Sequence, residues 1–221
     1  MTFPPYFVHI PKNMGNFIYK NYYNINQTDK TRFYGLYDSI YDYYDTYGIP
    51  YSKKDENIVY NSTISIDHLT LEELLNLGIL FKKDLEERFV FAIVREPIDR
   101  FISLCNYWNV PPNQIIYNIT KIHLLKKMKY NLYQHFRPQS DYIKDIKKHA
   151  KKYRIFFMNK PHEIRDVLAT YFPDKQVDFG EKIYKSRDTY NRCMLSRENM
   201  AFLQNYYRED FLLRSESFLQ I

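Results

Sequence analysis

The chain has 221 residues, with 32 basic and 26 acidic side chains and a formal net charge of +6. Its 45% hydrophobic and 18% aromatic content excludes a disordered or low-complexity protein, and its length favours a single domain over residues 1–221. No apolar run approaches the ~18 residues of a membrane span, and no signal peptide precedes the first apolar segment. We therefore expect a cytoplasmic or otherwise soluble protein without a membrane span.

The first half of the chain alternates short apolar runs with helical patterns. Thr70 and Glu73 form a capping box, and Gly78 provides a stop signal after it. His68 therefore precedes the first turn of a helix. The elements predicted here are strands over residues 6–10 and 58–66 and helices over residues 16–23 and 71–77.

The second half begins with a continuous apolar run at residues 88–94 (RFVFAIV), which is typical of a strand buried on both faces of a parallel sheet. Apolar residues from Ile98 to Cys105 recur at helical spacing after it. A strand over 154–158 and helices over 163–171 and 197–213 are also predicted. This alternation predicts an α/β fold with three layers, α/β/α, around a central parallel sheet.

Two regions depart from the alternation. Residues 34–60 are rich in tyrosine and form an irregular excursion, which either covers one sheet edge or lines a groove for a substrate. Residues 121–152 are helical and rich in lysine, which is typical of a solvated face. Cys105 and Cys193 lie far apart and are interpreted as reduced packing residues.

The loop at residues 9–16 (HIPKNMGN) joins the first strand to the first helix. Backbone N–H groups and the positive end of a helix can hold a phosphate at such a place. Lys12 precedes Gly15 and no GxxxxGK[ST] pattern is present, so this is not a Walker A loop. The alternative is an ordinary connection with a surface lysine.

A second anion site is predicted where the apolar strand ends. Arg95 stands at that end and Ser103 lies eight positions later in the following helix. Ligands collect at the carboxyl edge of α/β sheets, and a guanidinium with a hydroxyl suits a phosphate monoester. The alternative is a structural ion pair of Arg95 with Glu96 or Asp99.

These motifs resemble those of sulfotransferases that use 3′-phosphoadenosine 5′-phosphosulfate (PAPS). FVHIPKNMGNFIY is similar to their 5′-phosphosulfate loop, and FAIVREPIDRFISLCNY is similar to their 3′-phosphate motif. Within that superfamily the carbohydrate sulfotransferases of the heparan sulfate and chondroitin type are most similar. The resemblance implies a P-loop-like sulfotransferase fold. It extends over most of the chain through SIDHLTLEEL, HFRPQSDYI, IYKSRDTY and LSRENMAFLQNYYREDF.

The resemblance also implies a role for particular residues. Where the related loop reads like PKTGGTS, this chain has Met14 for a glycine and Asn16 and Phe17 for hydroxyl residues, which puts the strength of cofactor binding in question. The residues implied to bind the cofactor are Lys12, Asn13, Gly15 and Asn16 at the phosphosulfate, Arg95 and Ser103 at the 3′-phosphate, and Lys185, Ser186 and Arg187 in a late closing loop.

Sulfuryl transfer to an alcohol needs a cation on the leaving side and a base on the acceptor side. Lys12 can supply the cation, and no metal is expected. The resemblance and the suitable pKa of an imidazole favour His68 as the base, with a capping or surface histidine as the alternative. His135 is the second candidate and, with Arg137 and Gln139, is predicted to contact the acceptor. His9 is predicted to be packed in a strand.

The sequence thus predicts transfer of sulfate from PAPS to a hydroxyl of a saccharide or a related acceptor. Three alternatives remain open: a P-loop-type kinase, a basic nucleic-acid-binding module, and a degenerate relative that binds nucleotide without turnover. A kinase would need a Walker loop and Mg²⁺ ligands, and neither is recognisable in the sequence. A nucleic-acid-binding module would need a known motif, which the sequence also lacks. We therefore expect a glycan or another hydroxyl-bearing acceptor as the partner, and no nucleic acid.

Overall fold

The computed structural model describes residues 4–23, 36–37, 64–121, 130–179, 189–213 and 219–220. These residues form a mixed α/β protein with a central sheet in the order β1-β4-β5-β6. Strands β1, β4 and β5 run parallel, and β6 pairs antiparallel with β5. The strands are β1 (Tyr6–Val8), β4 (Phe89–Val94), β5 (Lys152–Phe157) and β6 (Leu219–Gln220), with a separate antiparallel pair of β2 (Leu36–Tyr37) and β3 (Ile64–Ser65).

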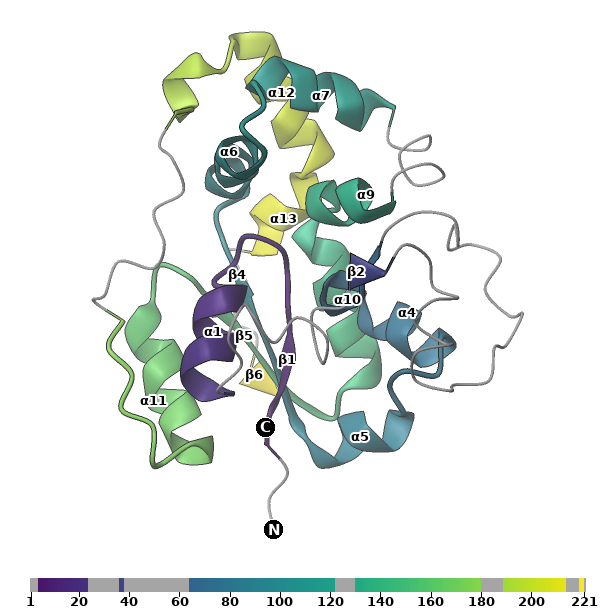
Figure 1. Cartoon of the computed structure of the whole chain (residues 1–221), viewed down its shortest axis with the longest axis vertical. Coiled ribbons are helices and arrows are strands. Elements are labelled where there is room, and N and C mark those ends of the chain that lie inside the picture. Colours follow the sequence, from purple (N-terminus) through teal and green to yellow (C-terminus); the bar gives the residue numbers. More distant parts are fainter. Residues whose placement is uncertain are drawn as a thin grey trace.

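Apolar side chains of the parallel strands alternate between two cores, as the period of two in a strand requires. Phe7 and Phe91 belong to one core, and Val8 and Val90 belong to the other. Helices α1 (Gly15–Tyr22) and α11 (Pro161–Tyr171) contribute to the first core. The second core lies under α4 (Leu71–Asn76), α5 (Lys82–Glu87) and α10 (Gln139–His149), on the other side of the sheet (Figure 1).

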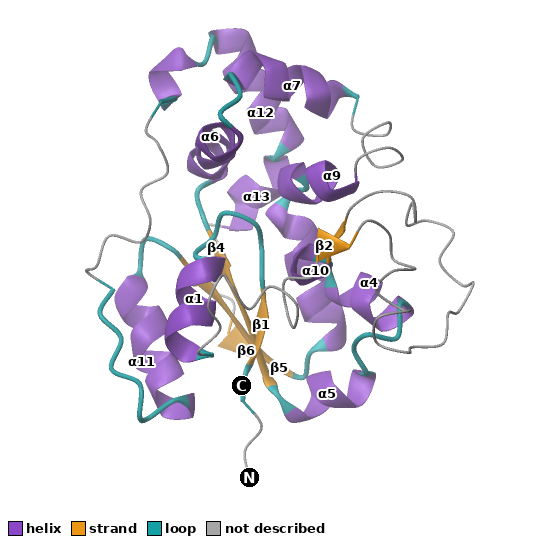
Figure 2. Cartoon of the chain, in the orientation of Figure 1, coloured by secondary structure: helices purple, strands orange, loops and turns teal. Residues whose placement is uncertain are grey.

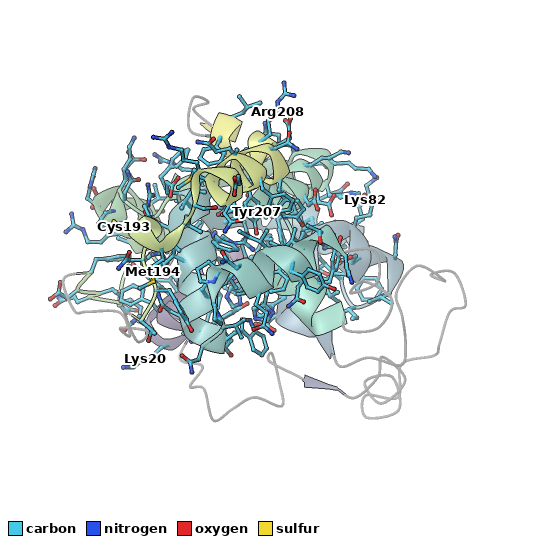
Figure 3. The ribbon with its side chains drawn as sticks, turned by 90° about the horizontal axis from the view of Figure 1, so that it is seen from above. Lys20, Lys82, Cys193, Met194, Tyr207 and Arg208 are labelled. Atoms are coloured by element: carbon cyan, nitrogen blue, oxygen red, sulfur yellow. The ribbon has the colours of Figure 1, made fainter. Side chains whose placement is uncertain are left out.

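A group of helices lies beyond the carboxyl ends of the parallel strands (Figures 1 and 2). Phe101 and Leu203 belong to the third core, which these helices build. Tyr207 is buried in this core, whereas Cys193 and Met194 are exposed at the edge of the group of helices (Figure 3). The helices are α6 (Pro97–Trp108), α7 (Pro112–Thr120), α9 (Tyr130–Phe136), α12 (Arg197–Tyr206) and α13 (Arg208–Leu212), with 3-10 turns at η1 (Ile66–His68) and η2 (Arg192–Met194).

Local sequence signals explain several of these boundaries. Thr70 and Glu73 form the predicted capping box, with the Glu73 N–H donating to Thr70 Oγ1. Pro97 opens α6, and Glu96 accepts a hydrogen bond of 2.7 Å from the Asp99 N–H. Gly78 has φ +68°, the left-handed conformation that glycine adopts without strain. The capping box and the stop at Gly78 are confirmed as predicted.

Other expectations differ from the structure. The helix predicted over 197–213 is divided at Tyr207, and its second part directs Asp210 toward α10. The strand predicted over 6–10 ends at Val8, because Ile10 already accepts a turn hydrogen bond from Asn13. Of the regions 34–60 and 58–66, the structure describes the residues of β2 and β3 and Ile66, which belongs to a 3-10 turn.

The two cysteines have different environments. Cys105 is buried in the helical core, as predicted, and burial raises the pKa of its thiol to about 12. Cys193 is exposed in η2, so its interpretation as a packing residue is wrong. Both thiols are free. In the part of the chain that the structure describes, no helix has the length and hydropathy needed to cross a bilayer.

Candidate functional site: a cationic, histidine-lined sheet edge

The loop after β1 has an unusual backbone. Lys12 and Met14 both adopt left-handed conformations, with φ values of 69° and 64°. Alternation of left-handed and right-handed residues turns successive N–H groups toward a common concavity that suits an anion. No described side chain caps the N-terminus of α1. The loop predicted to bind a phosphate therefore lies beside the positive N-terminal end of α1, a place that favours an anion.

Asn13 and Gly15 hold this loop in place. The buried Asn13 amide donates to Ile93 O at 2.8 Å and to Gln139 Oε1 at 2.6 Å. Gly15 packs so closely on His9 that an added Cβ would lie 1.8 Å from His9 Nε2. Asn16, the next residue of the predicted phosphosulfate site, is exposed at the start of α1.

Lys12 extends over an aromatic ring at the edge of the site. Its Nζ lies 4.1 Å from the ring centroid of Tyr107, a cation–π geometry. Burial, together with the nearby positive charge of Arg95, lowers the pKa of the Lys12 ammonium to about 8. Among the described residues Lys12 forms no ion pair, so its charge is not neutralised by a carboxylate there.

Arg95 follows β4, the strand next to β1, and therefore lies at the same sheet edge as Lys12. Gln139 holds its backbone on both sides: Gln139 Nε2 donates to Arg95 O at 2.8 Å, and Arg95 N donates to Gln139 Oε1 at 2.9 Å. The guanidinium makes no hydrogen bond or ion pair with the described residues. Burial and the charges of Arg100 and Arg192 lower its pKa, and the charge of Asp99 opposes them.

The alternative role predicted for Arg95 is an ion pair with Glu96 or Asp99. In the structure a different arginine pairs with these acids. Arg192 Nε donates to Asp99 Oδ1 at 2.8 Å, and its other arm contacts Glu96. Ser103 is buried on α6, eight residues after Arg95. Arg95 and Ser103, the residues predicted to bind the 3′-phosphate, therefore lie at the end of β4 and on the helix that follows it. The nearby acids, Glu96 and Asp99, pair with Arg192 instead.

A cluster of histidines and one carboxylate lies beside this edge. Asp67 Oδ2 lies 2.9 Å from His9 Nδ1 and 3.3 Å from His68 Nε2. The His68 ring contacts the rings of His9 and His135 edge to face, at centroid distances of 4.8 and 4.7 Å. His68 Nδ1 is buried and has no hydrogen-bond partner among the described residues. The predicted base, the second candidate and the histidine predicted to be packed are thus brought together.

The surroundings of His68 favour its neutral form. Burial is the largest cause, and His135, His9, Arg100 and Lys12 add positive charge or the capacity for it. Together they hold the pKa of His68 well below its usual value of 6.5. An imidazole that stays neutral at pH 7 keeps a lone pair available for a proton.

Arg100 is a site residue that the sequence reasoning missed. It is 1% exposed, and it donates to Pro11 O through Nε and to His135 O through an η nitrogen, both at 3.0 Å. It thereby ties the β1–α1 loop to the end of α9. The sequence does contain a signal for its role, because Arg100 is a charged residue on the apolar face of the helix between Pro97 and Leu104.

Two residues predicted to contact the acceptor have structural partners here. Arg137 forms a two-pronged ion pair with Glu73, at 2.5 and 2.8 Å. Gln139 is 0% exposed and binds Asn13 and the backbone of Arg95. This geometry favours a positioning role for both over direct contact with an acceptor. Residues Lys185, Ser186 and Arg187, assigned to a closing loop, lie outside the described residues.

The His9, Asp67 and His68 side chains could also hold a metal ion, because one ligand atom of each lies within 4.8 Å of the others. Two imidazoles and a carboxylate suit Zn²⁺ or a similar ion. However, Arg100, Lys12 and His135 bring positive charge or the capacity for it close to His68, which disfavours an additional dication. The arrangement suits an anion better.

Comparisons with protein-family models, with curated proteins and with solved structures find no match for this chain. The functional assignment therefore depends on the geometry of the site and on the motifs in the sequence.

Proposed function

We propose that this protein is a PAPS-dependent sulfotransferase with a P-loop-like, three-layer α/β/α fold, acting on a hydroxyl of a saccharide or related acceptor. One observation carries the proposal: two cations, Lys12 and Arg95, lie at the ends of adjacent parallel strands, and neither forms an ion pair with the described residues. Two anionic groups on one ligand would match them, as the 5′-phosphosulfate and 3′-phosphate of PAPS do.

The proposed reaction uses the histidine cluster on the acceptor side. The acceptor oxygen forms a bond to sulfur while the bond from sulfur to the bridging oxygen of the phosphosulfate breaks. The acceptor proton passes to His68 Nδ1, the nitrogen that faces away from Asp67 and has no partner. The 3′-phosphoadenosine 5′-phosphate (PAP) leaves with its charge stabilised by Lys12 and the loop N–H groups.

Donor binding also improves the proposed base. Burial, and after it the positive charges near His68, lower the pKa of His68 in the unliganded protein. The negative charge of a bound donor offsets them, so the proton affinity of His68 rises when the donor is present. Base strength and donor binding are therefore coupled in this mechanism.

The first test is thermal unfolding with PAP, compared with ATP and Mg²⁺. A ligand that binds only the native protein stabilises it by about 2.7 kcal/mol at a hundredfold excess over Kd. We expect PAP to raise the melting temperature in the presence of EDTA. No change at millimolar PAP would exclude the sulfotransferase assignment, and a preference for ATP with Mg²⁺ would favour a kinase.

Arg95→Ala gives a sharper test of the 3′-phosphate site. A charge-assisted contact contributes about 1.5–3 kcal/mol, so the variant should bind PAP at least about tenfold more weakly. Its affinity for adenosine 5′-phosphosulfate, which lacks the 3′-phosphate, should change much less. Arg165→Ala, which removes an exposed arginine on α11, is the control. Equal losses for both ligands in Arg95→Ala would mean that Arg95 only supports the fold.

A further inference from the structure

Two large aromatic side chains are exposed together at the end of α6. Tyr107 is 57% exposed and Trp108 is 37% exposed, and their ring centroids lie 5.3 Å apart. The His135 ring lies nearly parallel to Tyr107 at 6.0 Å and edge to face with Trp108 at 5.3 Å. We call Tyr107, Trp108 and His135 the aromatic shelf.

The position of the shelf distinguishes it from other exposed apolar residues. Most of α6 is buried, and Tyr107 and Trp108 belong to none of the three apolar cores. Single exposed apolar side chains such as Phe81 and Tyr171 are ordinary on a protein surface. The shelf differs from these because it joins two parts of the site. Its Tyr107 ring lies under the Lys12 ammonium, and its His135 ring contacts the ring of His68.

This position lies on the acceptor side of the proposed reaction. Lys12 marks the place of the migrating sulfuryl group, and the Tyr107 ring centroid is 4.1 Å from its Nζ. His68, the proposed base, must lie near the acceptor hydroxyl and contacts His135 of the shelf. A ring-shaped acceptor that presents its hydroxyl between Lys12 and His68 would lie against the shelf.

We propose that the aromatic shelf binds a pyranose ring of the acceptor, an inference that rests on the proposed function. An aromatic face carries partial negative charge and attracts the slightly positive C–H groups on one side of a sugar ring. The hydroxyls at the sugar edge remain available to Lys12, while the buried His135 supports the Tyr107 ring from within. The shelf therefore selects carbohydrate acceptors over small aliphatic alcohols, which have no such face.

The chain offers a direct probe, because Trp108 is its single tryptophan. The fluorescence of the PAP-saturated protein is titrated with hexasaccharides of unsulfated chondroitin, heparosan and cellulose, and with ethanol as the aliphatic control. Acrylamide quenching then measures whether Trp108 becomes covered. We expect at least one hexasaccharide, and not ethanol, to shift the emission and to protect Trp108.

Two tyrosine variants form a matched pair. Tyr107→Ala should weaken hexasaccharide binding about tenfold, and by more than it weakens PAP binding through the lost contact with Lys12. Tyr107→Phe keeps the ring and should retain both. Tyr117→Ala is the control, since Tyr117 is also 57% exposed and also lies under a lysine, Lys121, but on α7. Both positions are exposed, so circular dichroism should show folded proteins.

The outcomes are distinct. If none of the three hexasaccharides changes the emission at millimolar concentration, or if Tyr107→Ala behaves like Tyr117→Ala, the proposal is wrong. If PAP alone protects Trp108 and excludes the sugar, the shelf holds the adenine instead, which also overturns it. Failure of PAP to raise the melting temperature would reject the sulfotransferase assignment. Sugar binding by the shelf would remain measurable in that case.

Discussion

Gly15 opens α1 with its backbone against the imidazole of His9. The site needs this close approach, because His9, the residue after β1, contacts Asp67 while α1 begins directly beside it. Any side chain at position 15 would displace the His9 ring. The glycine is therefore required by packing and not by an unusual φ.

We predict that Gly15→Ala destabilises the protein by about 1–3 kcal/mol, the usual effect of overpacking. For a chain of this size each kcal/mol corresponds to about 2–4 °C in melting temperature. A double-mutant cycle with His9→Ala checks the cause. In the His9→Ala background the same substitution should be nearly neutral, because the clashing ring is gone. An equal loss in both backgrounds would place the strain elsewhere.

Met14 accounts for one departure from the sulfotransferase pattern, where a glycine is usual. Its left-handed conformation costs about 1–2 kcal/mol relative to the right-handed one. However, the side chain is buried against the α1 and α11 core, and full burial of a methionine contributes about 1.5–3 kcal/mol. The second effect offsets the first, so the loop conformation is retained without the glycine.

The third residue-scale feature is His68. We predict that His68→Ala leaves PAP affinity and fold intact and lowers sulfate transfer by roughly 10²–10⁴, the usual contribution of a positioned base. The measurement is mass-spectrometric detection of labelled sulfate on a hexasaccharide. His149→Ala is the control, since His149 on α10 also has a buried nitrogen without a partner. If His135→Ala loses transfer and His68→Ala does not, His135 is the base.

At the scale of elements, α13 fixes the start of α10. The buried Asp210 carboxylate accepts hydrogen bonds from the Gln139 N–H at 2.9 Å and the Ser140 N–H at 2.8 Å. A carboxylate at a helix N-terminus is also favoured by the helix dipole. The buried side-chain amide of Gln139 also accepts hydrogen bonds from Asn13 and from the backbone of Arg95. The start of α10, the β1–α1 loop and the end of β4 therefore meet at this one side chain.

We predict that Asp210→Ala destabilises the protein by about 2–5 kcal/mol, because it leaves the buried Gln139 N–H and the partly buried Ser140 N–H without acceptors. Glu209→Ala, at the exposed neighbouring position, should remain within about 0.5 kcal/mol of the wild type. Urea unfolding measures both variants. A small effect of Asp210→Ala would show that water replaces the carboxylate at this helix start.

At the scale of the whole molecule, the packing of distant segments creates a positive field around the site. Lys12 comes from the β1–α1 loop, Arg95 from the end of β4, Arg100 from α6 and His135 from α9. Asp67 is the carboxylate in direct contact with the histidine cluster. Burial, the largest cause, and this field together lower the pKa values of both His68 and Lys12 in the unliganded protein.

The field leads to a prediction about pH. The kcat/KM for the donor should decrease at low pH as His68 is protonated, with a midpoint well below 6.5, and should decrease above about 8 as Lys12 loses its charge. Lys12→Arg should move the alkaline decrease to higher pH, because a guanidinium stays protonated. An alkaline midpoint unchanged in Lys12→Arg would show that another group controls it.

Local patterns in the sequence were sufficient to predict the buried strand β4, the helix α6 and the capping box before α4. They also placed Lys12 and Arg95 at strand ends, because apolar periodicity and turn residues act over a few neighbouring positions. That the two cations lie on one sheet edge follows once β1 and β4 are parallel neighbours. Their ligand remains a prediction.

Only the tertiary structure decided which polar residues meet. His9 and Asp67 are 58 residues apart, and Asn13 and Gln139 are 126 residues apart, yet each pair forms a hydrogen bond. Such contacts depend on strand order and on the direction of each crossover, which periodicity within a segment does not encode. For the same physical reason Gln139 and Arg137 look like acceptor contacts in the sequence, while the fold buries both with structural partners.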